Sequence, residues 1–274
     1  LAVNGRPLTR TDNIYAYFQS TVGKQVTLSV NSSPSTVGAR NVVVEPIGND
    51  TQLRHWHWVE KNRKYVEDVS NGKLGYVYLP NTGGAGYTYF NRMFFAQIDK
   101  EGMIIDERRN GGGQAANYIT DVLSRQYLAG WKDRDGEIFD TPAGAIYGPK
   151  VMLIDQDAGS GGDFLPYSFR EMGIGTLIGT RTWGGLIGIS ANPGLIDGAS
   201  LTVPYFRFFN ANGEWTVENM GVAPDIEVQL MPGEVNRDFD SQLDRGVREA
   251  LKQLETFKPV RRDEAPETPT KPGG

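Results

Sequence analysis

The middle of the chain alternates between short apolar runs and segments with helical spacing of apolar residues. Runs of this kind predict strands, and a period of 3.6 residues predicts helices. Strands are expected at residues 74–79, 103–106, 151–154 and 176–179, with helices at about 87–98, 115–127 and 163–172. Strands separated by helices are typical of parallel βαβ units with right-handed crossovers. The predicted fold class is therefore α/β, and the loops that leave the carboxyl ends of the strands are the first place to look for chemistry.

The first 47 residues have a different pattern. Strands are expected at residues 1–3, 26–30 and 41–47, with a helix capped by Thr11 or Asp12 that carries Ile14, Tyr17 and Phe18 on one face. So few elements do not close a sheet, so the pattern predicts that a partner segment is missing. Apolar residues at helical spacing over residues 51–70 then predict a connecting helix.

The last third of the chain is expected to be rich in β-structure before it ends in a helix. Residues 185–230 carry a hairpin signal at Asn210-Ala-Asn-Gly213, and residues 239–254 are amphipathic. The tail, residues 258–274, is rich in Pro, Lys and Glu, which predicts disorder.

Composition narrows the function classes. The 274 residues, 39% of them hydrophobic, suffice for one large or two modest domains. A net charge of −5 without a dense basic cluster argues against nucleic-acid binding, and the absence of cysteine excludes disulfides, thiolate catalysis and Cys-ligated zinc. No apolar run reaches membrane-spanning length, and the start at Leu1 does not resemble a signal peptide. Because Leu1 is not a natural initiator, the chain is expected to be a fragment that starts inside a domain.

A serine follows the predicted strand at residues 151–154. The segment Asp155-Gln-Asp-Ala-Gly-Ser160-Gly-Gly-Asp163 breaks the strand at Gly159, and a helical pattern begins at about Gly161. A strand, a tight turn and a helix expose the Ser160 hydroxyl beside the free N–H groups of a helix N-terminus. A nucleophile needs both an accessible oxygen and donors for the oxyanion that forms after attack. The alternative is that Ser160 merely caps the helix.

A glycine loop, Arg109-Asn-Gly-Gly-Gly113, follows the predicted strand at residues 103–106. The carboxyl ends of parallel strands meet at one edge of a sheet, so this loop and the Ser160 turn are expected on the same rim. That coincidence favours catalysis over capping. The loop lacks the Lys-Ser/Thr of a P-loop and the full dinucleotide fingerprint, so phosphate binding is disfavoured.

Four motifs occur in a fixed order along the chain: Asn110-Gly-Gly-Gly113, Ala158-Gly-Ser-Gly-Gly-Asp163, Gly179-Thr-Arg-Thr-Trp-Gly-Gly185 and Val217-Glu-Asn-Met-Gly-Val-Ala-Pro-Asp225. Together they resemble the C-terminal half of tricorn-type proteases, serine peptidases of the tail-specific (S41-like) group. The resemblance covers the chain up to about Phe257. It implies a partial PDZ-like domain at residues 1–47, a connecting helix at 48–71, a crotonase-like catalytic domain at 72–257 and a disordered tail at 258–274.

The resemblance assigns roles residue by residue. Ser160 would be the nucleophile, and the backbone N–H groups of Gly113 and Gly161 would form the oxyanion hole. Glu218 would be the acid that orients the catalytic histidine through an intervening serine; its alternative is a surface glutamate of a hairpin. Peptides or unfolded polypeptides would be the substrates, with no cofactor or metal. A hexamer is the implied assembly, in the cytoplasm or alternatively the periplasm.

The sequence offers no evident general base to take the proton of Ser160. The chain has only His55 and His57, which lie two apart on a predicted helix and so point to different sides. In tricorn-type enzymes the base lies in a Ser-His pair before the PDZ-like domain, which would precede Leu1. We therefore expect a fragment without its base, inactive alone. The lysine base of the related tail-specific proteases has no counterpart, because Gly185 stands at its position.

Four further charged residues have simpler interpretations. Asp163 lies in the first turn of a helix, where an acid is stabilised by the helix dipole whatever its function. Asp106 and Asp155 end strands on the predicted rim; a metal or glycosidase site there is disfavoured because no histidine or third acid lies at ligand spacing. Arg181 could bind a substrate carboxylate, but it is expected to form an ion pair within the protein.

Two alternatives of other function classes stay open. One is a non-catalytic crotonase-like domain that binds peptides or scaffolds an oligomer. The other is a crotonase relative that handles acyl-CoA thioesters, because that fold also uses glycine-loop oxyanion donors. A serine at the turn is not needed to stabilise an enolate, which counts against the second alternative.

Overall fold

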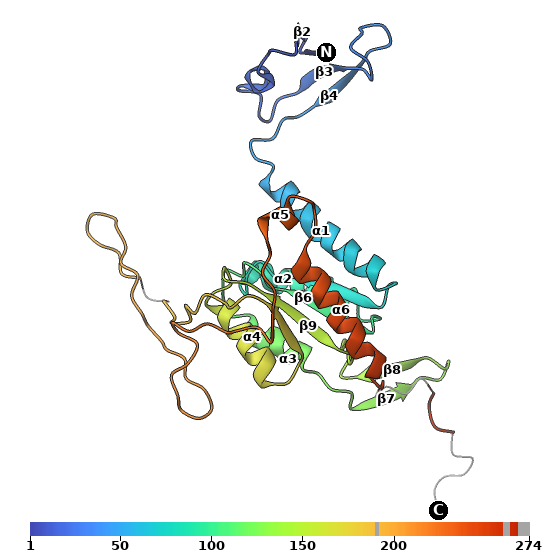
Figure 1. The fold of residues 1–274 in the computed structure, drawn as a ribbon, viewed down its shortest axis with the longest axis vertical. Coiled ribbons are helices and arrows are strands. Elements are labelled where there is room, and N and C mark those ends of the chain that lie inside the picture. The colour runs from blue at the N-terminus through green and yellow to red at the C-terminus, as the bar shows by residue number, and fades with distance from the viewer. Residues whose placement is uncertain (190–191, 260–263, 268–274) are drawn as a thin grey trace, which may run out of the picture. The chain divides into compact units, whose positions relative to one another are not determined.

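A computed structural model describes residues 1–189, 192–259 and 264–267, so most of the predicted tail lies outside the described residues. The chain divides into two compact units, Leu1–Trp58 and Val59–Gly274 (Figure 1). Helix α1 (Thr51–Val69) contains the boundary between them. The domain assignments made from the sequence stay predictions.

The first unit is a small antiparallel sheet with very little core. Its strands are β1 (Ala2–Val3), β2 (Arg6–Pro7), β3 (Val26–Val30) and β4 (Arg40–Val44), in the order β2-β1-β3-β4. Among its residues only Val3 and Val26 are buried. The expected helix is a single 3-10 helix, η1 (Ile14–Phe18), and its cap is Asn13, whose side chain accepts the Tyr15 N–H.

The second unit confirms the predicted α/β class. A five-stranded parallel sheet has the order β11-β10-β9-β6-β5. Every residue of β5, β6 and β9 is buried, as the continuous apolar runs of a sheet covered on both faces require. The strands are β5 (Leu74–Tyr78), β6 (Gly102–Asp106), β9 (Lys150–Ile154), β10 (Thr176–Gly179) and β11 (Ile226–Glu227).

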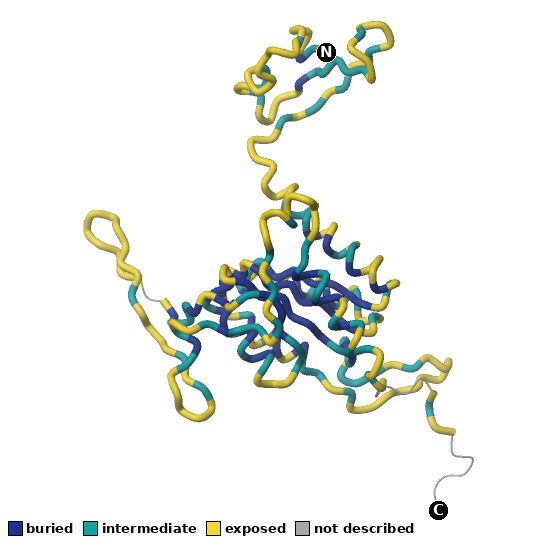
Figure 2. Tube along the Cα trace, viewed as in Figure 1, coloured by how far each residue is buried: buried dark blue, intermediate teal, exposed yellow. Residues whose placement is uncertain are grey.

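Helices cover both faces of this sheet (Figures 1 and 2). One face packs Met103, Ile105 and Met152 against apolar residues of α2 (Gly84–Phe95), α3 (Ala116–Leu123) and α4 (Gly161–Glu171). Alternate residues point the other way: Val151 and Leu153 lie against Gly246 of α6 (Ser241–Thr256). A short α5 (Pro232–Val235) precedes α6.

Two expectations about local structure need correction. The helix predicted at residues 115–127 ends at Leu123, and an unpredicted hairpin follows, with β7 (Ala129–Lys132) paired to β8 (Ile138–Thr141). Among the described residues of the segment predicted to be rich in strands, 185–189 and 192–230, β11 is accompanied only by isolated bridges, such as Phe209 with Trp215. Its aromatic residues are largely exposed, so no packed sheet face holds a longer ladder together. The turn at Asn210–Gly213 is present, with Gly213 at φ +81°.

Candidate active site

Ser160 lies at the tip of the turn between β9 and α4. Its backbone has φ 57° and ψ −116°, a conformation that is uncommon for any residue except glycine and concentrates at functional sites. The residue is partly exposed and lines a cavity of about 550 Å³. This is the strained strand–turn–helix arrangement that presents a nucleophilic side chain to a substrate.

The glycine loop packs directly against this turn. The Asn110 carbonyl accepts the N–H of Gly159 at 3.0 Å, and the Asn110 side chain accepts the N–H of Gly112 at 2.9 Å. Gly112 has φ +86°, and a Cβ there would lie 2.6 Å from Cβ of Ser160, so only glycine fits. Buried Thr82 holds the loop from the other side through its N–H, which donates to the Gly112 carbonyl at 3.0 Å. The rim predicted from the sequence is confirmed.

The backbones of Gly113 and Gly161 lie against each other, and both residues line the same cavity as Ser160. A Cβ on Gly161 would come within 2.8 Å of the Gly113 nitrogen. Neither N–H donates a hydrogen bond to any other residue that the structure describes. Gly161 is the first residue of α4, where the backbone N–H groups have no partner within the helix and the helix dipole favours negative charge. Two unused donors flank a hydroxyl, which is the arrangement that an oxyanion hole requires.

The cavity in front of Ser160 is mainly apolar. Its walls carry Phe164 from α4, Leu186 and the aromatic rings of Phe206 and Phe208, together with the backbone of Gly113. A cavity with apolar walls and a few polar groups is typical of a site that binds a side chain and orients a polar bond.

Comparison with known proteins agrees with this geometry. The profile of peptidase family S41 matches residues 73–228, more than half of the chain. The chain belongs to peptidase family S41. Tricorn protease of Thermoplasma volcanium is 34% identical over 94% of this chain, and tricorn protease homolog 1 of Streptomyces coelicolor is 37% identical over 86%. The crystal structure of the tricorn protease superposes with a TM-score of 0.84 at 32% identity over 93% of this chain and 25% of that one.

The chain spans about a quarter of the length of the curated relatives it matches: 25% of the Thermoplasma volcanium protein and 22% of the Streptomyces protein. One shorter match, 38% identical over 84% of this chain, is a protein of Sulfurisphaera tokodaii whose name describes it as the C-terminal subunit of a tricorn-like protease. Within the described residues, no helix is long and apolar enough to cross a membrane.

Asp163 ties the Ser160 turn of this S41 domain to the loop after β10. Its carboxylate is fully buried and accepts four hydrogen bonds. The donors are the N–H of Ser160 at 2.8 Å, the Thr182 hydroxyl at 2.6 Å, and the N–H groups of Gly184 at 2.7 Å and Gly185 at 2.9 Å. These bonds support the structural role expected for Asp163, since they fix the backbone on which Ser160 stands.

Glu218 lies behind the cavity wall and not in the cavity. Its carboxylate accepts the N–H groups of Leu186 at 2.6 Å and Ile187 at 2.8 Å, and it lines a smaller cavity of about 110 Å³. Its neighbours Val217 and Asn219 both have positive φ, 70° and 60°, which is a genuine outlier for a β-branched residue. The structure brings Ser160, Gly113 and Gly161 together, and it connects Glu218 to them through the segment at Leu186.

No histidine or lysine lines the Ser160 cavity among the described residues. His55 and His57 belong to the first unit, where the His55 ring contacts the rings of Trp56 and Trp58. Gly185, at the position of the lysine in the related branch, donates its N–H to Asp163. Besides the Ser160 hydroxyl and amide donors, the cavity lining includes the basic side chain of Arg207.

The two other acidic residues predicted on the rim stabilise loops. Asp155 accepts the N–H groups of Arg109 at 2.8 Å and Asp157 at 3.1 Å. Asp106 accepts the Tyr76 hydroxyl at 2.8 Å and is paired with Arg108 at 2.7 Å. No cluster of three potential metal ligands occurs in the described part of the chain. Arg181 donates to the Met220 carbonyl, where an acidic partner was expected.

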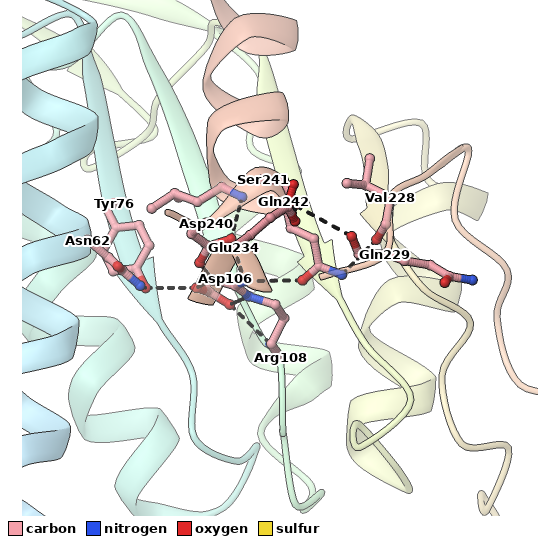
Figure 3. Close-up of polar contacts among 11 residues, drawn as sticks. Asn62, Tyr76, Asp106, Arg108, Val228, Gln229, Glu234, Asp240, Ser241 and Gln242 are labelled. Carbon is pink, nitrogen blue, oxygen red and sulfur yellow. Dashed lines mark hydrogen bonds and ion pairs between the residues drawn. The ribbon is translucent and has the colours of Figure 1, made fainter. Parts of the chain in front are cut away.

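Sequence reasoning missed the buried polar network beneath the glycine loop, which Figure 3 shows. Arg108 is buried and joins Asp106 of β6 to Asp240 at 2.9 Å and Gln242 at 3.1 Å, next to the N-terminus of α6. Asp240 also caps α6 by accepting the Leu243 N–H at 3.0 Å. The signal was in the sequence: an acid and an arginine directly after a fully apolar strand must be buried, and buried charges need partners.

Proposed function

We propose that this chain carries the nucleophile and oxyanion hole of a serine peptidase that hydrolyses peptide bonds in oligopeptides or unfolded chains. The observation that carries the proposal is the pair of unused N–H groups at Gly113 and Gly161 beside the strained Ser160 turn. Membership of peptidase family S41 and the similarity to tricorn proteases supply the reaction class.

In the proposed reaction, Ser160 Oγ attacks the peptide carbonyl carbon and loses its proton to a general base. The carbonyl oxygen becomes an oxyanion that receives hydrogen bonds from the N–H groups of Gly113 and Gly161. Collapse breaks the C–N bond, the base returns the proton to the leaving amine, and an acyl-enzyme remains on Ser160. Water then hydrolyses the ester and regenerates the hydroxyl.

We propose that the base is a histidine that does not come from the described cavity; the resemblance implies one from a Ser-His pair ahead of the PDZ-like domain. The Ser160 cavity lacks a histidine or lysine among the described residues, and the matched relatives are about four times longer. Glu218 would orient that histidine through an intervening serine. By the same resemblance the working assembly would be a hexamer in the cytoplasm.

A fluorophosphonate probe tests the assignment in the full-length protein, because it phosphonylates only an activated serine, with loss of fluoride. We expect labelling at Ser160 that Ser160→Ala abolishes and that Ser124→Ala, a serine just past α3, leaves unchanged. Absence of labelling in a folded full-length protein that contains the upstream histidine would overturn the assignment.

A second candidate is a non-catalytic peptide-binding domain, favoured by the apolar cavity and its lack of a base in the described residues. Binding of a fluorescent peptide separates the two. A non-catalytic domain would bind the peptide without hydrolysing it, in the wild type and in Ser160→Ala alike.

A further inference from the structure

Glu107 is a buried acid that the proposed reaction does not use. It directly follows β6, and its N–H extends the ladder by donating to the Leu153 carbonyl at 3.1 Å. The side chain is fully buried. One oxygen, Oε2, accepts the side-chain amide of Asn110 at 3.0 Å, and Oε1 has no partner among the described residues. A buried carboxylate with one hydrogen bond and no cation would be costly.

The surroundings of Glu107 raise its pKa and so favour the protonated form. Burial raises the pKa of Glu107 well above its ordinary value of 4.5, although the Asn110 bond opposes this. The acids facing it raise the pKa further: Asp163 of α4, Asp155 after β9 and Asp106 of β6. The nearby arginine, Arg108, is engaged by Asp106 and Asp240.

Asn110 is the residue through which Glu107 reaches the site. Its side-chain Nδ2 donates to Glu107, so its Oδ1 is turned to the N–H of Gly112, at 2.9 Å. Its backbone carbonyl accepts the N–H of Gly159, the residue before Ser160. One asparagine thus holds the glycine loop and the serine turn at once. Without an acceptor at Glu107, the amide of Asn110 could rotate and release Gly112.

We propose that Glu107 is a positioning residue that orients Asn110 and thereby sets the distance between Ser160 and the N–H of Gly113. The inference rests on the proposed peptidase function. Glu107 does not touch the substrate in this scheme; it acts only through Asn110.

A substitution with the shape of a protonated Glu107 side chain gives the proposal a sharp chemical test. Glutamine has the shape of a protonated glutamic acid: its Oε1 can accept the Asn110 amide, and its NH₂ replaces the O–H. Glu107→Gln should therefore preserve the site, and Glu107→Ala should lose it. A displacement of about 1 Å in a catalytic group costs on the order of 100-fold in rate.

The experiment measures kcat and KM for a chromogenic peptide with the full-length protein. We expect Glu107→Gln to stay within about threefold of the wild type and Glu107→Ala to lose about 10- to 100-fold in kcat with KM unchanged. Asn110→Ala should lose as much, and the double variant no more than either single one, because the two residues act in series. Glu101→Gln, an exposed acid just before β6, is the matched control.

A pH profile gives a readout that simple loss of structure would not. As pH rises, Glu107 ionises and the buried charge disturbs the loop, so kcat of the wild type should fall on the alkaline side. Glu107→Gln should lack that limb. The folded chain also retains a proton that the unfolded chain loses above pH about 4.5. The stability contributed by that proton is therefore present below this pH and lost as pH rises through the folded pKa. Glu107→Gln should flatten this dependence.

The outcomes separate the two claims. If the wild type shows no hydrolysis that depends on Ser160, the proposed function fails and this inference falls with it. If hydrolysis depends on Ser160 but folded Glu107→Ala keeps the wild-type kcat, only the Glu107 inference fails. Should Glu107→Ala not fold, Asn110→Ala decides: a folded Asn110→Ala variant that keeps the wild-type kcat overturns the proposal.

Discussion

The two sides of the Ser160 cavity are built in opposite ways. On one side, the glycine loop and the serine turn rest on buried carboxylates, with Asp163 alone accepting four hydrogen bonds. On the other side lies an outer arm, residues 186–189 and 192–217, with isolated bridges and exposed aromatic residues such as Trp215 (Figure 2). The groups proposed to stabilise the oxyanion are therefore preorganised, and the arm has far fewer interactions to fix its shape.

The largest expected effect comes from removing the carboxylate of Asp163, which holds the side of the cavity formed by the glycine loop and the serine turn (the rigid side). Asp163→Ala would leave the N–H groups of Ser160, Gly184 and Gly185 without acceptors. Each buried donor left unsatisfied costs about 1–3 kcal/mol, so we expect a loss of at least about 3 kcal/mol in the free energy of unfolding. Chemical denaturation measures it, with Asp135→Ala, in the exposed turn of the β7–β8 hairpin, as the control. A loss below about 1 kcal/mol would contradict the view that Asp163 holds the rim.

The second largest effect is expected from Gly112→Ala, which tests the contact between the glycine loop and the Ser160 turn. Gly112→Ala puts a methyl group 2.6 Å from Cβ of Ser160 and 2.9 Å from the Gly159 carbonyl, in a backbone with φ +86°. The glycine loop must move away, which displaces the Gly113 donor. Loss of an oxyanion donor typically costs about 100- to 1,000-fold in turnover, and we expect a fluorophosphonate labelling rate reduced by about that factor. Normal labelling of the folded variant would show that Gly113 is not the donor.

The positions of the glycine loop and the serine turn could be predicted from the sequence, because each directly follows an apolar strand. A glycine loop and a serine turn after adjacent apolar strands can lie only on one rim, and Ser160, Gly113 and Gly161 are found together there. The elements of the outer arm could not be predicted, because alternating residues there, such as Tyr205 and Phe209, do not pack against a sheet face. Arg108 escaped notice for another reason: its partner Asp240 lies far away in the sequence and is set by tertiary contacts. The contact of Glu107 with Asn110 is local, but the sequence pattern did not show that Glu107 is buried.

A smaller effect is expected where the arm meets the rim. Glu218→Gln keeps the size of the side chain but removes the charge that accepts the N–H groups of Leu186 and Ile187. Charge-assisted hydrogen bonds are roughly twice as strong as neutral ones, so the cavity wall should loosen. If Glu218 also orients the base, kcat of the full-length protein should fall about tenfold or more. Glu214→Gln, an exposed acid in the same arm that bonds Asn210, should leave kcat unchanged.

An equal fall in both variants would mean that the charge of the arm, and not the specific position of Glu218, affects the rate. A change in KM of the Glu218→Gln variant without a change in its kcat would limit the role of Glu218 to the cavity wall.

The smallest effect is expected from Gly213→Ala, which is the control for Gly112→Ala. Gly213 has nearly the same positive φ, +81°, but a Cβ there would meet no atom within 4 Å. Gly213→Ala therefore carries only the strain of a left-handed residue, about 1–2 kcal/mol, confined to the Asn210–Gly213 turn of the arm. We expect a small loss of stability and an unchanged labelling rate at Ser160. Because the two alanines carry the same intrinsic strain, the difference between their labelling rates measures the contact of Gly112 with Ser160. If Gly213→Ala slowed labelling as much as Gly112→Ala, the arm would have to be coupled to the oxyanion donors as tightly as the rim itself, and the contrast between the two sides would not hold.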